Sequence, residues 1–211
     1  MVSLAYLEVS VLLLGSFIGS MVAYSSFKGY KITGSPTLVR LAFAFFLLSL
    51  GLIIEGTKEI FGSLIGFLDL SVLEASLQAS GYFLLAFSHA MNVLTIQKIQ
   101  RIGTLGFLAP IALNALFTLR SLALLFLLYA TTETFLSYLR EKKRNTLIIA
   151  LGLVFLIVGE LLRWLSYFYP PLSLISIFSI SLKVIGFSTL LIPVVILIGR
   201  GGKYHELQKS D

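Results

Sequence analysis

The sequence predicts an all-α fold, a polytopic membrane bundle of seven transmembrane helices. The chain of 211 residues is 57% hydrophobic and only 12% charged, whereas a soluble domain carries about 25% charged residues. Its mean hydropathy is +0.97. Apolar runs of about 20 residues, long enough to cross a hydrocarbon core about 30 Å thick, recur along the chain.

Seven apolar spans lie between more polar connections. They cover residues 4–25, 37–57, 72–95, 102–119, 121–139, 146–168 and 172–199. The apolar stretch over 102–139, which contains the fourth and fifth spans, is interrupted only by residues 118–121. A single helix over this stretch would be about 57 Å long, nearly twice the core thickness. We therefore expect a turn near Arg120. Residues 1–200 then form one transmembrane domain, and residues 201–211 form a short cytoplasmic tail.

The sequence also predicts the structure of three further segments. Residues 1–20 lack the basic stretch of a signal peptide and are expected to be a retained first helix. Residues 59–70 are too apolar for a simple loop and too short to span, which indicates an interfacial segment. Residues 167–169 are aromatic and precede Pro170 and Pro171, a pattern typical of an interfacial anchor followed by a helix stop.

Charge in the connections predicts the orientation in the cell membrane. Twelve of the 16 basic residues fall in one set of connections. These are Lys28, Lys31, Arg40, Lys98, Arg101, Arg140, Lys142, Lys143, Arg144, Arg200, Lys203 and Lys209. The positive-inside rule then places the N-terminus outside and the C-terminus in the cytoplasm. The cluster over 140–144 is interpreted as a juxtamembrane signal next to anionic lipid, and no nucleic-acid partner is expected.

Composition and missing motifs exclude several functions. The chain has no cysteine, which removes disulfides and thiolate metal sites. It has two histidines, one of them in the tail, so one chain cannot build a bis-histidine haem within the membrane. No H-E-x-x-H motif or nucleophile elbow is present, which disfavours a hydrolytic enzyme. The absence of Cys and the scarcity of Gln and Met fit a thermophile.

An offset of 105 residues aligns 39–98 with 144–203 without gaps and places Glu55 on Glu160, Lys58 on Arg163 and Gln78 on Lys183. This register predicts a three-plus-one-plus-three plan. Its two parallel repeats, 1–98 and 121–203, are joined by a helix over 102–119. The plan resembles that of the SWEET sugar transporters in topology, although their Pro-Gln signature is absent. Such repeats imply a site at their interface near the membrane midplane.

Ionisable residues inside the spans mark candidate sites. Lys183 lies near the middle of the last span, where a cation needs a partner or a water-filled cavity. Glu133 lies at a similar depth in the fifth span and is the expected partner. The groups around Glu55 and Glu160 lie in the outer third, as either a structural ion-paired lock or an outer vestibule. The candidate ligand- or ion-pathway residues are Lys183, Glu133, Glu55, Glu160, Arg163, Lys58, Gln78, His89, Asn92 and Asn114.

The segment Lys183-Val184-Ile185-Gly186-Phe187 resembles the retinal-lysine segment of microbial rhodopsins. That resemblance implies retinal bound to Lys183 as a Schiff base, with a carboxylate counterion. The chain departs from the family at Ser179, where the family has aspartate, and in the third span, whose only acid is Glu74 at its outer end. We therefore predict no particular cofactor.

Three functions remain open. The first is a small secondary transporter or ion pathway with Glu133 and Lys183 as its central site. The second is a non-enzymatic sensory or partner-binding membrane module, in which the buried charges only fix helix packing. The third is an accessory subunit of a larger membrane complex. The expected partners are the lipid bilayer and either a second copy of the chain or another membrane subunit.

Overall fold

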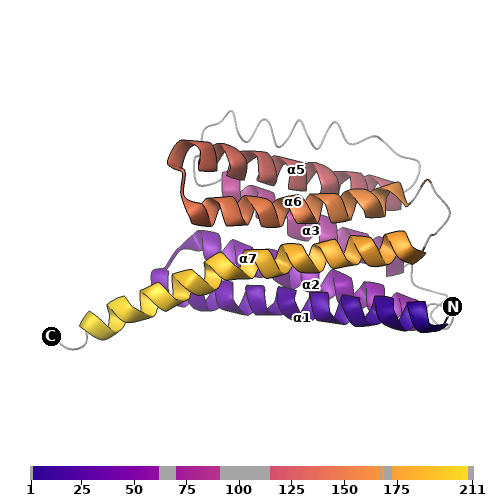
Figure 1. Ribbon diagram of the computed structural model, residues 1–211, viewed down its shortest axis with the longest axis horizontal. Coiled ribbons are helices and arrows are strands. Elements are labelled where there is room, and N and C mark those ends of the chain that lie inside the picture. Colours follow the sequence, from indigo (N-terminus) through magenta and orange to yellow (C-terminus); the bar gives the residue numbers. More distant parts are fainter. Residues whose placement is uncertain (1, 62–69, 91–114, 167, 169–172, 209–211) are drawn as a thin grey trace.

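The computed structural model describes residues 2–61, 70–90, 115–166, 168 and 173–208. Within this part the chain forms six long helices (Figure 1). They are α1 Val2–Thr33, α2 Pro36–Phe61, α3 Leu70–Ala90, α5 Ala115–Glu141, α6 Arg144–Leu165 and α7 Ser173–Gln208. All six are long and apolar enough to cross a membrane, as expected of an integral multi-pass membrane protein. Most of the expected fourth span, 102–114, lies outside the described residues.

The expected turn near Arg120 is wrong. Helix α5 runs without interruption from Ala115 to Glu141, and the Ser121 hydroxyl donates to the Phe117 carbonyl one turn earlier. The segment contains neither proline nor glycine, so nothing in its backbone chemistry ends a helix. The charged guanidinium of Arg120 also does not have to reach water at a turn, because it has carboxylate partners inside the bundle.

The six described helices close into a ring. Each packs against two neighbours in the order α1, α2, α3, α5, α6, α7 and back to α1. The ring therefore contains two consecutive triplets of antiparallel neighbours, α1–α2–α3 and α5–α6–α7. The two termini of the chain lie at opposite ends of the bundle (Figure 1).

Contacts between helix starts show that the two triplets run parallel. Glu74 near the start of α3 pairs with Arg120 near the start of α5. Glu8 near the start of α1 accepts a hydrogen bond from Ser176 near the start of α7. The short turns α1–α2 and α5–α6 therefore lie at the same end of the bundle. This arrangement agrees with the sequence-based grouping of their basic residues on one side.

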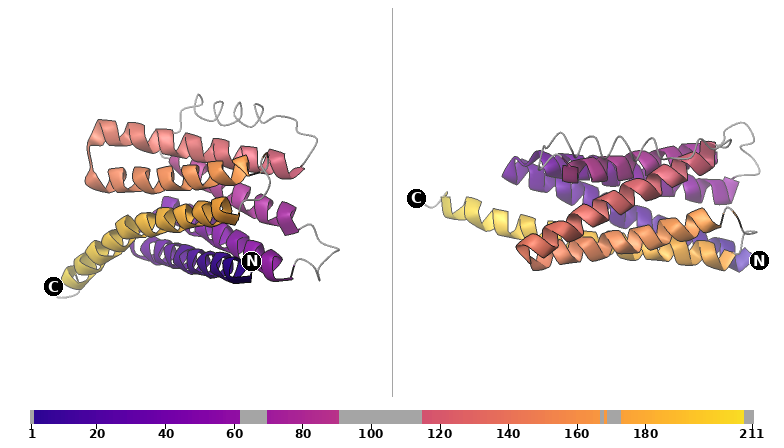
Figure 2. Two further views of the ribbon diagram at one scale, coloured as in Figure 1. Left: turned by 45° about the vertical axis from the view of Figure 1, so that its right-hand side comes forward. Right: turned by 90° about the horizontal axis from the view of Figure 1, so that it is seen from above.

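Small residues and a proline shape the packing. A Cβ atom on Gly15 or Gly19 would lie within 3.1 Å of α2 side chains, so α1 uses its G-x-x-x-G spacing against its own chain. Gly34 has φ +68° in the turn between α1 and α2, a conformation that favours glycine. Helix α7 contains Pro193 and bends in its second half (Figure 2).

Candidate functional site

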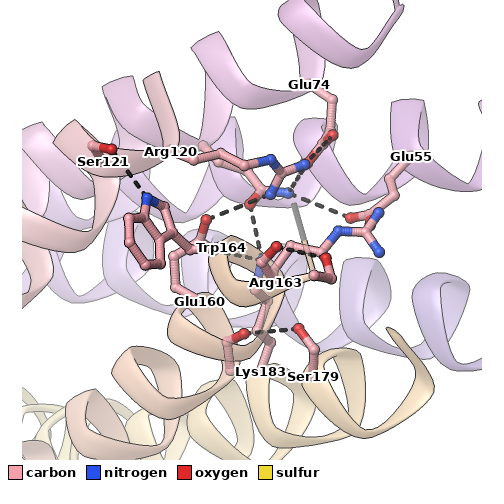
Figure 3. A network of polar contacts seen from close by, with 12 residues as sticks. Glu55, Glu74, Arg120, Ser121, Glu160, Arg163, Trp164, Ser179 and Lys183 are labelled. Atoms are coloured by element: carbon pink, nitrogen blue, oxygen red, sulfur yellow. Dashed lines mark hydrogen bonds and ion pairs between the residues drawn. The ribbon is translucent and has the colours of Figure 1, made fainter. Parts of the chain in front are cut away.

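A cluster of buried polar side chains occupies the centre of the ring toward the end where α1, α3, α5 and α7 begin (Figure 3). Every described helix contributes to it. We call it the ion cluster, and it consists of Glu8, Glu55, Glu74, Gln78, Arg120, Glu160, Arg163, Ser176 and Lys183.

Lys183 is 2% exposed and has two partners on other helices. Its Nζ lies 2.6 Å from Oε2 of Glu160 on α6 and donates to Oε1 of Gln78 on α3 at 2.9 Å. The expectation that Lys183 needs a buried partner is confirmed, but its expected pairing with Glu133 is wrong. Because α5 begins at residue 115, Glu133 lies about 27 Å along α5, whereas Lys183 lies about 15 Å along α7.

Arg120 links α5 to two neighbouring helices. Its Nη2 donates to both carboxylate oxygens of Glu74 on α3, at 2.9 and 3.1 Å. Its Nη1 lies 3.6 Å from Oε1 of Glu160. Glu160 therefore lies between two cations, Arg120 and Lys183, which compensates the loss of hydration of its buried carboxylate.

Arg163 forms the connection toward α1 and α2. Its guanidinium pairs with Glu55 of α2, and its Nη1 donates to the Ser176 hydroxyl of α7 at 2.6 Å. That hydroxyl donates in turn to the Glu8 carboxylate of α1. Gln78 connects the ion pair of Glu74 with that of Glu55, because its Nε2 donates to Glu74 at 2.8 Å and to Glu55 at 3.5 Å. The cluster is thus continuous across all six described helices.

Two glycines let the helices that carry the cluster approach each other. A Cβ atom on Gly51 of α2 would lie 2.9 Å from Gln78 Cγ, and one on Gly159 of α6 would lie 3.0 Å from Lys183 Cγ. The Gly159 carbonyl also accepts a hydrogen bond from the Ser179 hydroxyl at 2.7 Å. Glycine at these positions brings polar groups of paired helices within hydrogen-bonding distance.

The structure brings together five of the ten residues that sequence analysis selected. These are Lys183, Glu55, Glu160, Arg163 and Gln78. Lys58 is partly exposed one turn beyond Glu55, whose ion pair is instead with Arg163 on another helix. Glu133 lies toward the other end of α5. The side chains of His89, Asn92 and Asn114 lie outside the described part of the chain.

Thr131, Thr132 and Thr134 of α5 each donate to the backbone carbonyl four residues earlier, so each hydroxyl has a hydrogen-bond partner within its own helix.

Sequence analysis missed three charged members of the cluster. Arg120 was assigned to a turn, and Glu74 to the outer end of a span. Glu8 was not singled out. A signal for Glu74 was present, because Glu74 and Gln78 are four residues apart and share a helix face. For Glu8 the signal was an acid about one turn inside the otherwise apolar span over 4–25.

A cavity of about 260 Å³ lies at the opposite end of the ring, among α2, α3, α6 and α7. Most of its walls are apolar, and Thr37, Ser88 and Asn145 supply polar groups. Thr37 and Asn145 are the second residues of α2 and α6, so the cavity lies next to the two basic turns. Its volume is just below the range of about 300–1,000 Å³ typical of ligand pockets.

A buried apolar layer separates the cavity from the ion cluster. Leu85, Leu153 and Leu190 line the cavity. Each lies seven residues, about 10 Å along its helix, from a cluster residue on the same helix. Between these levels lie side chains that are almost fully buried, among them Leu48, Leu52, Tyr82, Leu156 and Phe187. Phe187 also packs edge-on against Phe45 of the cavity wall. The cavity and the cluster therefore lie one above the other along the ring, with a closed layer between them.

Comparisons with protein families, with curated proteins and with solved structures find no match to this chain. Among the described residues, no group of three or more His, Cys, Asp or Glu side chains is arranged to hold a metal ion. The ion cluster holds several paired charges inside the bundle.

Proposed function

We propose that the protein is a small secondary transporter. Its solute site is the cavity between α2, α3, α6 and α7, and its coupling site is the ion cluster. The observation that carries this proposal is their stacking along the ring, two helical turns apart and separated by buried apolar side chains. A carrier needs a site that reaches one side of the membrane while a closed layer blocks the other. Because the cavity walls are mostly apolar, they favour an apolar or amphipathic solute. Such a solute would form hydrogen bonds with the few polar side chains of the wall, Thr37, Ser88 and Asn145.

The proposal includes an internal repeat formed by the two helix triplets. Gly51 lies against the side chain of Gln78 and the carbonyl of Glu74. In the same way, Gly159 lies against the side chain of Lys183 and the carbonyl of Ser179. These two sets of contacts correspond when α2 matches α6 with an offset of 108 residues and α3 matches α7 with an offset of 105.

A second pair of glycine contacts supports the same correspondence. Gly81 lies against Leu48 and the Ala44 carbonyl, and Gly186 lies against Leu156 and the Gly152 carbonyl. In the proposed repeat, the gap-free register from the sequence applies to α3 and α7, and a register shifted by three residues applies to α2 and α6. With this shift Glu55 matches Arg163 instead of Glu160.

The repeat relates the walls of the cavity to each other. The related pairs are Thr37 with Asn145, Leu41 with Ile149, Phe45 with Leu153, Leu85 with Leu190, and Ser88 with Pro193. If the two triplets are repeats, the cavity lies at their interface, and transporters built from parallel repeats have their solute sites at that interface.

A sensory or partner-binding module is the second candidate, and one observation favours it. Glu55, Glu74 and Glu160 each have an ionic partner on another helix, as a permanent packing lock would require. In that case removing a pair changes stability and no solute crosses the membrane.

Transport is tested in proteoliposomes with a variant that fills the cavity. The chain has no cysteine, so Ser88→Cys gives a single reactive thiol in the cavity wall. Solutes from a mixed panel of amphipathic compounds that protect this thiol from a maleimide are then assayed for counterflow. We expect counterflow in the parent protein, its loss in Ser88→Trp and its retention in Ser80→Trp, which changes an exposed position on the same helix. Protection without counterflow would reject transport and favour the module.

A further inference from the structure

Carboxylates outnumber cations in the described part of the ion cluster. Four acids, Glu8, Glu55, Glu74 and Glu160, face three cations, Arg120, Arg163 and Lys183. The four acids are at most 8% exposed. An uncompensated negative charge on a side chain that is almost fully buried in a membrane-spanning bundle is costly, because burial removes most of its hydration. One additional positive charge would make the cluster neutral.

The excess charge can be assigned to one residue. Glu55 pairs with Arg163, Glu74 with Arg120, and Glu160 with Lys183. Glu8 remains: its carboxylate accepts a hydrogen bond from the Ser176 hydroxyl, and no described cation lies within ion-pair distance of it. Ser176 is itself held by Arg163, so Glu8 reaches the nearest cation only through this hydroxyl.

We propose that Glu8 is a proton-binding site, occupied at neutral pH, that makes the ion cluster neutral. The charged groups that face Glu8 from neighbouring helices are Glu59 and Glu55 of α2 and Arg163 of α6. Arg163 and Glu55 pair with each other, so their charges largely cancel, and the negative charge of Glu59 then disfavours a further negative charge at this position. We assign a proton to this position because one proton balances the single excess charge, and because among the described residues no group of three or more acids is arranged to hold a metal ion. Binding converts the carboxylate to a carboxylic acid, and release returns the proton to the aqueous phase.

Loss of this proton would change the rest of the cluster. An ionised Glu8 would compete with Glu55 for Arg163 through Ser176, and Glu55 is hydrogen-bonded to Gln78, the partner of Lys183. Protonation of Glu8 on α1 is thereby linked to the Glu55–Arg163 pair between α2 and α6. It is also linked to the Gln78–Lys183 hydrogen bond between α3 and α7. A role of this proton in driving transport rests on the proposed function, whereas its presence at Glu8 does not.

Infrared spectroscopy of the full chain in nanodiscs tests the site, because a protonated carboxyl has a C=O stretch separate from that of a carboxylate. At pH 7 we expect one such band, which shifts in D₂O, disappears in Glu8→Gln and persists in Glu141→Gln, a control acid exposed at the end of α5. Glu8→Gln should also keep the parent melting temperature at pH 7, because a neutral amide replaces a neutral acid.

Three outcomes would overturn the assignment. They are the absence of the band, its persistence in Glu8→Gln, and its loss on adding sodium chloride at constant pH, which would indicate a metal cation in place of the proton. A large loss of stability in Glu8→Gln at pH 7 would also contradict a neutral Glu8. None of these readouts depends on solute flux, so failure of the proton site and failure of transport are distinguishable.

Discussion

Lys183 shows how a buried positive charge is stabilised inside a membrane protein. Its ammonium group is charge-compensated by Glu160 and donates a hydrogen bond to the side-chain carbonyl oxygen of Gln78, both at short range. Pairing of this kind offsets desolvation, so removing one partner is more damaging than removing both.

Replacing Lys183 by methionine is therefore expected to destabilise the protein by about 3–5 kcal/mol, because Glu160 loses its closest cation. The double variant Lys183→Met and Glu160→Gln should recover part of this loss. Unfolding in mixed detergent, followed by the fluorescence of Trp164, the one tryptophan in the chain, measures both variants. Glu160→Gln alone is measured in the same way. If the stability losses of the two single variants simply add in the double variant, the two side chains do not interact.

At the residue scale the sequence predicted which buried charges matter better than it predicted their partners. The depth of Lys183 in its span was enough to indicate a polar interior, and Gln78, selected as a candidate from the alignment, accepts a hydrogen bond from it. Partner choice depends on where α5 begins and on which side of each helix faces the ring axis. Neither can be read from an apolar run whose composition is uniform, so Glu133 was selected in place of Glu160.

At the scale of helices, glycines fix which elements pack closely. Gly51 and Gly159 have no room for a side chain against α3 and α7, and both contacts support the ion cluster. Six of the expected spans correspond to helices because hydrophobicity over about 20 residues is a strong signal. The close approaches between them were less evident, since glycine is common in membrane helices and only the three-dimensional contacts show which of the 17 glycines are needed.

Gly51→Ala and Gly159→Ala are each expected to cost about 1–3 kcal/mol, because the added methyl group would lie 2.9 Å from the nearest neighbouring atom. Gly199→Ala is the matched control. It is also in a helix but has nothing within 4 Å, so alanine should stabilise it by about 0.5–1 kcal/mol. The same detergent unfolding assay compares the three. Equal effects at all three positions would show that close packing at α3 and α7 is not what these glycines provide.

At the scale of the whole molecule, the ring has two chemically different ends. One end carries the exposed basic residues of the α1–α2 and α5–α6 turns, including Lys31 and Lys143, together with the cavity. The ion cluster lies toward the other end. The parallel triplets explain this polarity, because equivalent turns of parallel units must lie on one side.

The positive-inside rule then predicts that the end with the cavity and the basic turns faces the cytoplasm. Since the parent chain has no cysteine, Lys143→Cys and Glu59→Cys each introduce a single exposed thiol at opposite ends of the bundle. In intact cells a membrane-impermeant maleimide should label Glu59→Cys and leave Lys143→Cys unlabelled, and permeabilisation should expose both. The reverse pattern would place the ion cluster on the cytoplasmic side, and Glu8 would then exchange its proton with the cell interior. Labelling of both thiols in intact cells would indicate a mixed orientation, which the charge difference between the two ends argues against.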